Sequence, residues 1–438
     1  MTRIPRSSRA LTRRSVIGGS AALAATALAG CAGTGEDSAQ GGDAKKLQFW
    51  SNHPGTSKSI EQELIKNFEK QSDGISVTLV DGGATYEDTQ QKFNAALSGG
   101  DLPDLVVVSD VTWFNFALNK QITPLEDLFE KADVDPGAYV KPLYDDYLFQ
   151  DKHYALPYSR STPLFYYNKD AWEKAGLEDR GPKDYDELRE WADVLKEKAG
   201  LDLSFTTGDG VGYLGWVGQG MFWAMGGAYS DEYTPTFTGD GALKAAAWLQ
   251  DFKKSGLYDV SKDPATVFGS GQSAACIEST GSLSGILESA KGKFEVGTAF
   301  LPGPEGDACP TGGAGVAIPA GISDERKVNA LKALGFLTNA ESTATFSQGT
   351  GYMPVQTAAV DSDSMKSYLK KTPQAKTALD QLPTTKPQDY ARVFVAGGDQ
   401  QIGGSFDKIV GGDSVEKTLE ALQSWMEPKL EQLAQKAK

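Results

Sequence analysis

Histidine and cysteine are scarce in this chain of 438 residues, which contains two histidines and three cysteines. The histidines, His53 and His153, lie far apart, and neither an HExxH nor a C-x-x-C motif is present. Because zinc sites need several such ligands at short spacing, no metal is expected. A GxSxG elbow and a GxxxxGK[ST] loop are also missing, so neither a histidine-based triad nor a P-loop is predicted. No cofactor is expected.

Basic residues are outnumbered by acidic ones, and the formal net charge is −15. Removal of residues 1–30 takes away five arginines and no acid, which changes this charge to −20. A nucleic-acid-binding protein needs the opposite balance and a basic face, so nucleic acid is not expected as a partner. Five arginines then remain: Arg160, Arg180, Arg189, Arg326 and Arg392.

The N-terminus has the layout of an export signal: an arginine-rich head followed by an uncharged apolar stretch, 16–29. Arg13 and Arg14 resemble a twin-arginine signal. The apolar stretch is shorter than the ~20 residues of a membrane span, which disfavours an uncleaved anchor. Leu28-Ala29-Gly30-Cys31 resembles a lipobox, in which Cys31 is acylated. We expect residues 1–30 to be a signal peptide with a lipobox and 31–45 to be a flexible tether, so that the protein is lipid-anchored at the extracytoplasmic face of the cell membrane.

The remaining residues are too many for one hydrophobic core, so two lobes are expected. Apolar runs alternate with segments of helical periodicity, which predicts an α/β protein with parallel, helix-covered sheets. The predicted strands are 47–50, 75–80, 104–108 and 274–278, and the predicted helices are 86–97, 185–198, 242–254 and 328–337.

The stretch SRSTPLFYYNKDAWEKAGL, residues 159–177, contains the apolar run Leu164–Tyr167. This run is too short for a membrane span and too continuous for a half-exposed strand, so we predict a strand buried on both faces. Asp170 is predicted to cap a short helix that ends at Gly176. The open end of such a unit is where α/β folds hold ligands.

Two alternatives remain open on the residues alone. Residues 210–215 match G-x-G-x-x-G, the pattern of a dinucleotide-binding loop, but the glycines that follow make a poor helix. Cys276 and Cys309 are able to form a disulfide in an exported protein, although the sequence does not fix their separation.

Several motifs together resemble the extracellular solute-binding proteins of ABC importers. They are GDLPDLVVVSD (100–110), YALPYSRSTPLFYYNKDAWEKAGL (154–177), PKDYDEL (182–188) and GYMPV (351–355). The resemblance implies a two-lobed, periplasmic-binding-protein-like α/β fold with a ligand cleft between the lobes and hinge crossings near 160, 302 and 340. Lobe 1 would comprise 46–159 and about 302–340, and lobe 2 would comprise 160–301 and about 341–438. It also implies a monomer that docks on permease subunits in the membrane and is not an enzyme.

A narrower resemblance is to the branch that binds sn-glycerol-3-phosphate and glycerophosphodiesters. It rests on Ser161-Thr162-Pro163, on 278–283, on Gly312-Gly313-Ala314, on 351–354 and on Arg392. The resemblance implies that a phosphate is surrounded by Tyr86, Ser161, Ser279, the Gly313 backbone, Tyr352 and Arg392. It further implies that Asp110 takes glycerol hydroxyls and that Tyr185 and Trp216 wall the glycerol or head-group end.

This sequence departs from the branch at three positions. Asp110 replaces a longer Glu, Tyr185 replaces Trp, and Arg160 replaces a small polar residue. A larger phosphodiester or an oligosaccharide is therefore an alternative ligand, and an exported hydrolase or lyase acting on glycans is the alternative of another class. The local chemistry agrees with phosphate, because a guanidinium makes bidentate bonds to it. Salt screens carboxylates that lie farther away than a Debye length of about 8 Å, whereas an adjacent arginine is not screened. The plainer interpretation makes Ser161 and Ser279 caps and Arg392 a salt-bridge partner.

Overall fold

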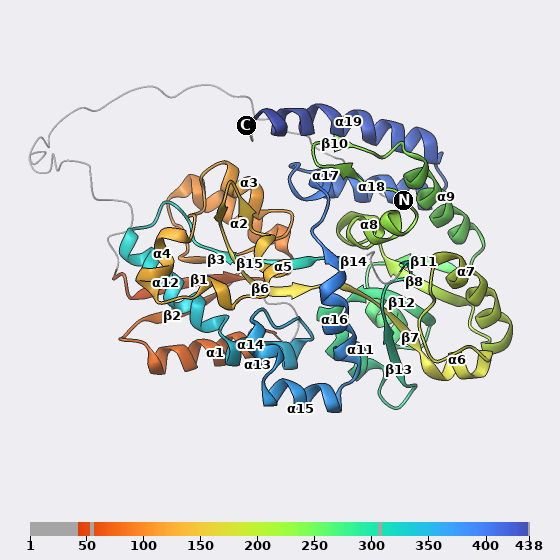
Figure 1. Ribbon diagram of the computed structural model, residues 1–438, viewed down its shortest axis with the longest axis horizontal. Helices are drawn as coiled ribbons and strands as arrows, with labels where there is room; N and C mark the ends of the chain where they lie inside the picture. Colours follow the sequence, from red (N-terminus) through yellow and green to blue (C-terminus); the bar gives the residue numbers. More distant parts are fainter. Residues whose placement is uncertain (1–42, 53–56, 305–308, 437–438) are drawn as a thin grey trace, which may run out of the picture. The chain divides into compact units, whose positions relative to one another are not determined.

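The computed structural model describes residues 43–52, 57–304 and 309–436. Within these residues the chain forms two five-stranded sheets, which Figure 1 shows with the helices that flank them. The first sheet has the order β2-β1-β3-β15-β6, with β1 Lys46–Ser51, β2 Ser76–Asp81, β3 Leu105–Ser109, β6 Leu156–Ser161 and β15 Gly312–Ala317. β1 is parallel to β2 and β3, but β15 is antiparallel to β3 and β6. The sheet is therefore mixed, not parallel as predicted.

The second sheet is also mixed and has the order β11-β8-β12-β7-β13. Its strands are β7 Pro163–Asn168, β8 Leu203–Gly208, β11 Tyr258–Ser261, β12 Ser273–Ser279 and β13 Val296–Ala299. β8 is parallel to β11 and β12, whereas β7 is antiparallel to β12 and β13. Short two-stranded ribbons are formed by β4 Leu148–Phe149 with β5 Lys152–His153, β9 Ser230–Asp231 with β10 Thr234–Pro235, and β14 Cys309–Pro310 with β16 Thr385–Lys386.

The helices follow one another along both halves of the chain. In the first half they are α1 Ser57–Gln71, α2 Tyr86–Gly99, α3 Trp113–Leu118, α4 Glu126–Ala132, α5 Lys141–Asp145, α6 Lys169–Ala175, α7 Tyr185–Val194, α8 Gly215–Ala224 and α9 Asp240–Lys254. In the second half they are α10 Pro264–Gly269, α11 Leu283–Ala290, α12 Asp324–Leu337, α13 Ala340–Thr350, α14 Thr357–Val360, α15 Asp363–Lys371, α16 Gln374–Gln381, α17 Tyr390–Val393, α18 Gly398–Val410 and α19 Val415–Lys436. Each predicted helix is confirmed to within a few residues. Among the described residues, no helix has the length and apolarity needed to cross a membrane.

The inner strands of the first sheet are buried on both faces, as their apolar runs predict, whereas the edge strand β2 is partly exposed. Phe49 and Val107 belong to the core on one face, and Trp50 and Val108 belong to the core on the other. Successive side chains of a strand point to opposite faces, so an uninterrupted apolar run is needed when helices cover both.

The chain passes from the first sheet to the second within two residues, because β6 ends at Ser161 and β7 begins at Pro163. Leu164, Phe165 and Tyr166 are fully buried, which confirms the predicted doubly covered strand. The helix that follows ends at Gly176, in the left-handed conformation at φ 75°, as predicted. Its N-cap is Asn168 rather than Asp170, since the Asn168 side chain accepts a hydrogen bond from the backbone N–H of Ala171.

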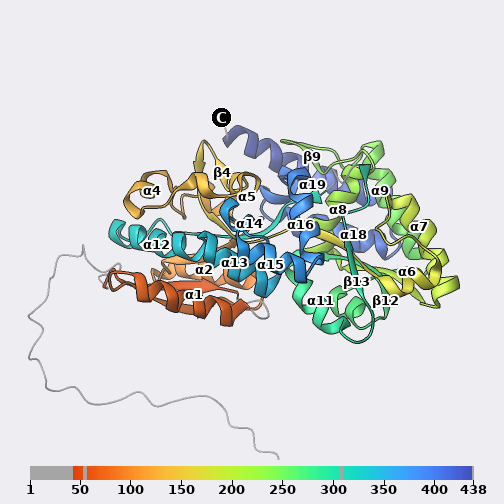
Figure 2. The same cartoon turned by 60° about the horizontal axis from the view of Figure 1, so that its bottom comes forward.

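The predicted lobe boundaries stay a prediction, and the contacts of one helix bear on them. The strands of the first sheet fall within 46–161 and 312–317, and those of the second fall within 163–299. α13 was expected in lobe 2, but it packs against α1 and α12, as Figure 2 shows. Its Phe346 ring lies 4.8 Å from the ring of Tyr158 in β6. α13 therefore contacts helices beside the first sheet and also α11 Leu283–Ala290, and the division of the chain into lobes stays a prediction.

Two further sequence alternatives are resolved by packing. Cys276 and Cys309 are buried free thiols, not a disulfide. The turn 210–214 packs against α18, and a Cβ on Gly210 would lie 2.1 Å from the carbonyl oxygen of Gly403. Gly210 therefore serves close backbone packing, and the dinucleotide-loop interpretation is wrong. Residues 1–42, including Cys31 and most of the predicted tether, and also His53, lie outside the described residues.

Candidate functional site

A cavity of about 710 Å³ is lined by residues that follow strands of both sheets. The side that belongs to the first sheet and its helices supplies Tyr86, Asp110, Ser161, Gly313 and Tyr352. The other side supplies Trp216 from α8, Ser279 from the end of β12 and Arg392 from α17. The structure thus brings eight of the predicted site residues to one cavity, although they come from segments spread over most of the chain.

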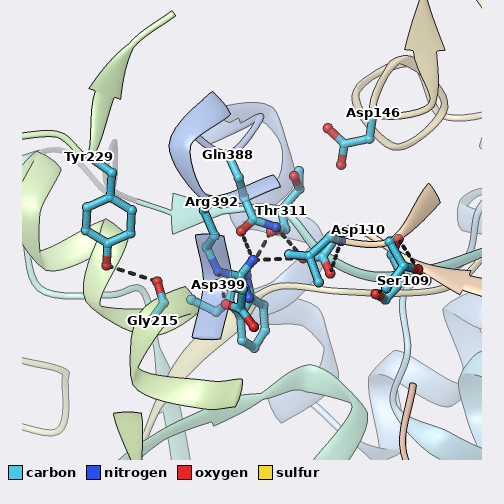
Figure 3. A network of polar contacts seen from close by, with 12 residues as sticks. Ser109, Asp110, Asp146, Gly215, Tyr229, Thr311, Gln388, Arg392 and Asp399 are labelled. Atoms are coloured by element: carbon cyan, nitrogen blue, oxygen red, sulfur yellow. Dashed lines mark hydrogen bonds and ion pairs between the residues drawn. The ribbon is translucent and has the colours of Figure 1, made fainter. Parts of the chain in front are cut away.

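Arg392 is the cationic centre of this cavity (Figure 3) and is only 4% exposed. Its Nη1 donates to Asp110 Oδ2 at 3.2 Å, and its Nε lies 2.8 Å from Asp399 Oδ1. Gln388 completes the network, because its amide donates to Asp110 and accepts from Arg392. Burial alone would lower the pKa of Arg392, but Asp399 and Asp110 raise it above its ordinary value. Arg392 is therefore a buried, fully charged donor held from two sides.

Asp399 and Gln388 are functional candidates that sequence reasoning missed. Asp399 lies in the first turn of α18 and lines the cavity, and burial raises its pKa despite the neighbouring guanidinium. Neither residue belongs to a motif, and each comes near Arg392 only through the fold.

The two tyrosines of the cavity are hydrogen-bonded to each other. Tyr86 is the first residue of α2, and its hydroxyl bonds the side chains of Tyr352 and Ser159. Tyr352 stacks on Phe346 at 5.7 Å between ring centroids, with 12° between the ring planes. Burial raises the pKa of both hydroxyl groups, so both stay protonated at neutral pH and are able to donate.

The two glycines at the start of β15 permit close approach. A Cβ on Gly312 would lie 2.4 Å from the ring of Trp216, whose Nε1 donates to the carbonyl of Thr311 at 2.8 Å. Gly313 has φ +92°, and a Cβ there would meet the carbonyl oxygen of Ser159 at 2.1 Å. The carbonyl of Gly313 in turn accepts a hydrogen bond from the N–H of Asp110 at 3.0 Å. Glycine at both positions thus lets the cavity wall form.

Another part of the cavity wall surrounds the buried carboxyl group of Glu278. This group accepts hydrogen bonds from the Tyr213 hydroxyl, from the Ser279 N–H at 2.8 Å and from the Ser282 hydroxyl at 3.0 Å. Burial raises the pKa of Glu278 to about 7, against which these hydrogen bonds act only in part. The Ser279 hydroxyl accepts from the N–H of Gly281 at 3.1 Å, so it is a cap, as the plainer interpretation held, and also lines the cavity.

Tyr185 was predicted to wall the ligand, but it is not among the residues that line the described cavity. Its side chain is 4% exposed and belongs to the core of the second sheet, where its ring packs edge-on against Trp248 at 5.2 Å. The reason is its place at the start of α7, whose inward face covers the sheet rather than the cavity.

Arg160, the third departure from the family pattern, does not line the cavity either. It is fully buried in β6, where it pairs with Asp146 and donates to the Tyr147 hydroxyl at 2.8 Å. Burial raises the pKa of Asp146 to about 6, against the opposite effect of Arg160. Arg160 therefore has a structural role: its bonds to Asp146 and Tyr147 hold β6 next to Ser161, which lines the cavity. Within the described residues, no group of three or more His, Cys, Asp or Glu side chains is placed to hold a metal ion.

Comparisons with known proteins show which family and which fold this chain is similar to. A family model described as "Bacterial extracellular solute-binding protein" matches residues 63–377. The sn-glycerol-3-phosphate-binding periplasmic protein UgpB of Escherichia coli K12 is 29% identical over 377 residues, which cover 81% of this chain and 84% of that protein. The UgpB protein of Salmonella typhimurium is 28% identical over the same shares.

Among solved structures, UgpB from Mycobacterium tuberculosis in complex with glycerophosphocholine is 46% identical, with a TM-score of 0.85. The match covers 89% of this chain and 99% of that one. The GacH receptor of Streptomyces glaucescens is similar in fold, with a TM-score of 0.76 at 19% identity, over 88% of this chain and 98% of that receptor. These similarities confirm the predicted fold class, a two-lobed α/β fold of the periplasmic-binding-protein type.

Proposed function

Because this chain belongs to the bacterial extracellular solute-binding proteins, we propose that it captures sn-glycerol-3-phosphate or a glycerophosphodiester such as glycerophosphocholine for an ABC importer. Members of this family act outside the cytoplasm and bind small solutes. Their role is binding, in contrast to the glycan-acting hydrolase or lyase that the sequence left as an alternative.

The observation that carries the proposal is the position of Arg392. It is a buried guanidinium at the wall of a cavity that also presents the side chains of Tyr86, Ser279 and Tyr352. A guanidinium forms two parallel, charge-assisted hydrogen bonds to a phosphate, and neutral hydroxyl donors complete the oxygen shell. One similar protein is named for sn-glycerol-3-phosphate, and another was solved in complex with glycerophosphocholine. Both support the same ligand class.

The carboxylates of Asp110 and Asp399 compete with a phosphate for Arg392. Both lie within ion-pair distance of it in this structure. Burial raises the pKa of Asp399 despite the neighbouring guanidinium, which weakens its hold on Arg392 relative to a fully solvated carboxylate. Asp110 is then placed to accept from the glycerol hydroxyls, which are the donors that a carboxylate needs.

An oligosaccharide is the second candidate ligand, and the acidic lining of the cavity favours it. Glu87, Asp110 and Glu278 accept hydrogen bonds from sugar hydroxyls when ionised, and the ring of Trp216 offers a flat apolar surface. This candidate assigns no role to the charge of Arg392, which distinguishes the two.

Isothermal titration calorimetry of the purified protein with sn-glycerol-3-phosphate, glycerophosphocholine and a maltooligosaccharide separates these candidates. We expect stoichiometric binding of one or both phosphate compounds and none of the sugar. Selective binding of the sugar would overturn the proposed ligand class, and turnover of any ligand would overturn the binding role.

The remaining parts of the proposal concern the setting of the receptor. Acylation of Cys31 is proposed to anchor it, after export through the twin-arginine route, with residues 31–45 as the tether. The monomer is proposed to close over its ligand by a hinge motion at the crossings between the sheets, and the closed form would dock on the permease subunits.

A further inference from the structure

A second cavity, of about 360 Å³, adjoins the first. Val111, Arg392 and Asp399 line both cavities, so the buried ion pair stands at the border between them. The second cavity is otherwise formed by side chains from α2, from α3 and the residues after it, and from the segment that joins α17 to α18.

The lining of the second cavity is rich in primary carboxamides. They are Gln90, Asn94, Asn115, Asn119, Gln121 and Gln400. Apart from the pair Arg392–Asp399, none of the described residues that line it is charged. Each carboxamide both donates and accepts, so the lining matches a neutral group with several hydroxyls better than an ammonium or a second phosphate.

Two of the carboxamides continue a row of side chains that begins in the main cavity. On α2, Tyr86, Gln90 and Asn94 follow one another at a spacing of four, which places them on one helix face. Tyr86 lines the main cavity, and the other two line the second. Among the hydrogen bonds of the described residues, only the Asn119 carboxamide is engaged, through its donation to the Asn115 carbonyl at 2.7 Å. The other five are therefore available to a ligand.

A phosphodiester has two organic arms, and Arg392 borders two cavities. Resting on the proposed function, we propose that the second cavity is a head-group subsite of a glycerophosphodiester whose phosphate lies at Arg392. The group it takes is an uncharged polyol, such as a second glycerol or a cyclitol. A simple glycerol-3-phosphate has no second arm and leaves this subsite to water.

Calorimetry with glycerophosphoinositol and with sn-glycerol-3-phosphate tests the subsite in the full chain. The variant Gln90→Leu/Asn94→Leu removes two carboxamides from partly exposed helix positions, and Gln91→Leu is the matched control because Gln91 is exposed on the same helix and lines neither cavity. We expect the double variant to bind glycerophosphoinositol at least tenfold more weakly and sn-glycerol-3-phosphate within twofold of the unmodified protein. Gln91→Leu should change neither affinity.

Two results overturn the inference in distinguishable ways. If the unmodified protein binds sn-glycerol-3-phosphate but the double variant keeps its affinity for glycerophosphoinositol, or loses both ligands equally, the subsite is wrong while the proposed function stands. If the unmodified protein binds neither compound, both the proposed function and the subsite fail.

Discussion

Nη1 of Arg392 lies 3.2 Å from Oδ2 of Asp110, although 282 positions separate the two residues in the chain. The contact joins α17 to the end of β3 at the wall of the cavity. It brings together a cation suited to phosphate and a carboxylate suited to glycerol hydroxyls. The predictions below test this pairing and the wall that supports it.

Arg392→Ala should weaken the binding of sn-glycerol-3-phosphate by about 1.5–3 kcal/mol, the usual contribution of a hydrogen bond to a charged group. Calorimetry measures this, with Arg189→Ala as control, because Arg189 is partly exposed on α7, where it pairs with Asp193 and lies over the ring of Phe252, away from the cavity. If the alanine variant does not fold, Arg392→Lys keeps the charge, loses the bidentate geometry and should still bind more weakly. Unchanged affinity in a folded variant excludes the role.

Tyr352→Phe should reduce the affinity for the same ligand by about 0.5–1.5 kcal/mol, because it removes one hydroxyl donor and keeps the ring. The stacking on Phe346 is retained, so the free energy of unfolding should fall by no more than the loss of the hydrogen bond to Tyr86, about 0.5–1.5 kcal/mol. Tyr368→Phe, at a half-buried position on α15, is the control. Equal affinities for all three proteins would mean that the Tyr352 hydroxyl does not touch ligand.

Gly313→Ala should lower the free energy of unfolding by more than about 1 kcal/mol, since alanine is strained at positive φ. The added Cβ would also meet the Ser159 carbonyl at 2.1 Å. Gly404→Ala is the matched control: Gly404 is inside α18 with open space around it, so the change should stabilise by up to ~1 kcal/mol. Urea unfolding of both variants measures the difference. A Gly313→Ala protein as stable as the unmodified one would contradict the requirement for glycine at position 313.

Glu278 should make the protein less stable as the pH rises. Its pKa in the folded chain is about 7 and its ordinary value is 4.5, so between these values the folded state binds the proton that the unfolded state releases. Stability is therefore lost from about pH 4.5 up to pH 7 and is constant above. At about 1.4 kcal/mol per pKa unit the loss is on the order of 3 kcal/mol.

Urea unfolding at pH 5 and pH 8 measures this loss, and Glu278→Gln is the comparison because glutamine keeps the shape and cannot ionise. We expect the unfolding free energy of the variant to fall less between the two pH values than that of the unmodified protein. Equal changes in the two proteins would show that Glu278 is ionised throughout.

Cys31→Ser should release the protein from the membrane, because the substitution removes the thiol at which we propose the lipid is attached. Fractionation of cells that express either form, followed by detection of the protein, measures this. A variant that stays in the membrane fraction would contradict lipid anchoring at Cys31.

The sequence predicted most of the strands and helices because their signals are local. The uninterrupted apolar run Leu164–Tyr167 could only be covered on both faces, and the structure buries it so. The mixed direction of the sheets was missed, because β15 joins β3 and β6 from a distant part of the chain and nothing local records its direction.

The family resemblance named most of the residues that the fold brings to one cavity, and their contact with a ligand stays a prediction. Tyr86, Ser279 and Arg392 meet at one cavity, as the resemblance implied. Tyr185 stands in the core instead, since the face of a helix that turns inward depends on packing that the sequence does not fix. Asp399 and the carboxamides of the second cavity were not found, because single polar residues carry no sign of which others they will meet.

A crystal structure of the protein with glycerophosphocholine tests the central claim most directly. The account predicts that the phosphate lies in the cavity within hydrogen-bond distance of the Arg392 guanidinium, with the hydroxyls of Tyr86 or Tyr352 beside it. A phosphate bound elsewhere, with Arg392 still paired only with Asp110 and Asp399, would contradict it.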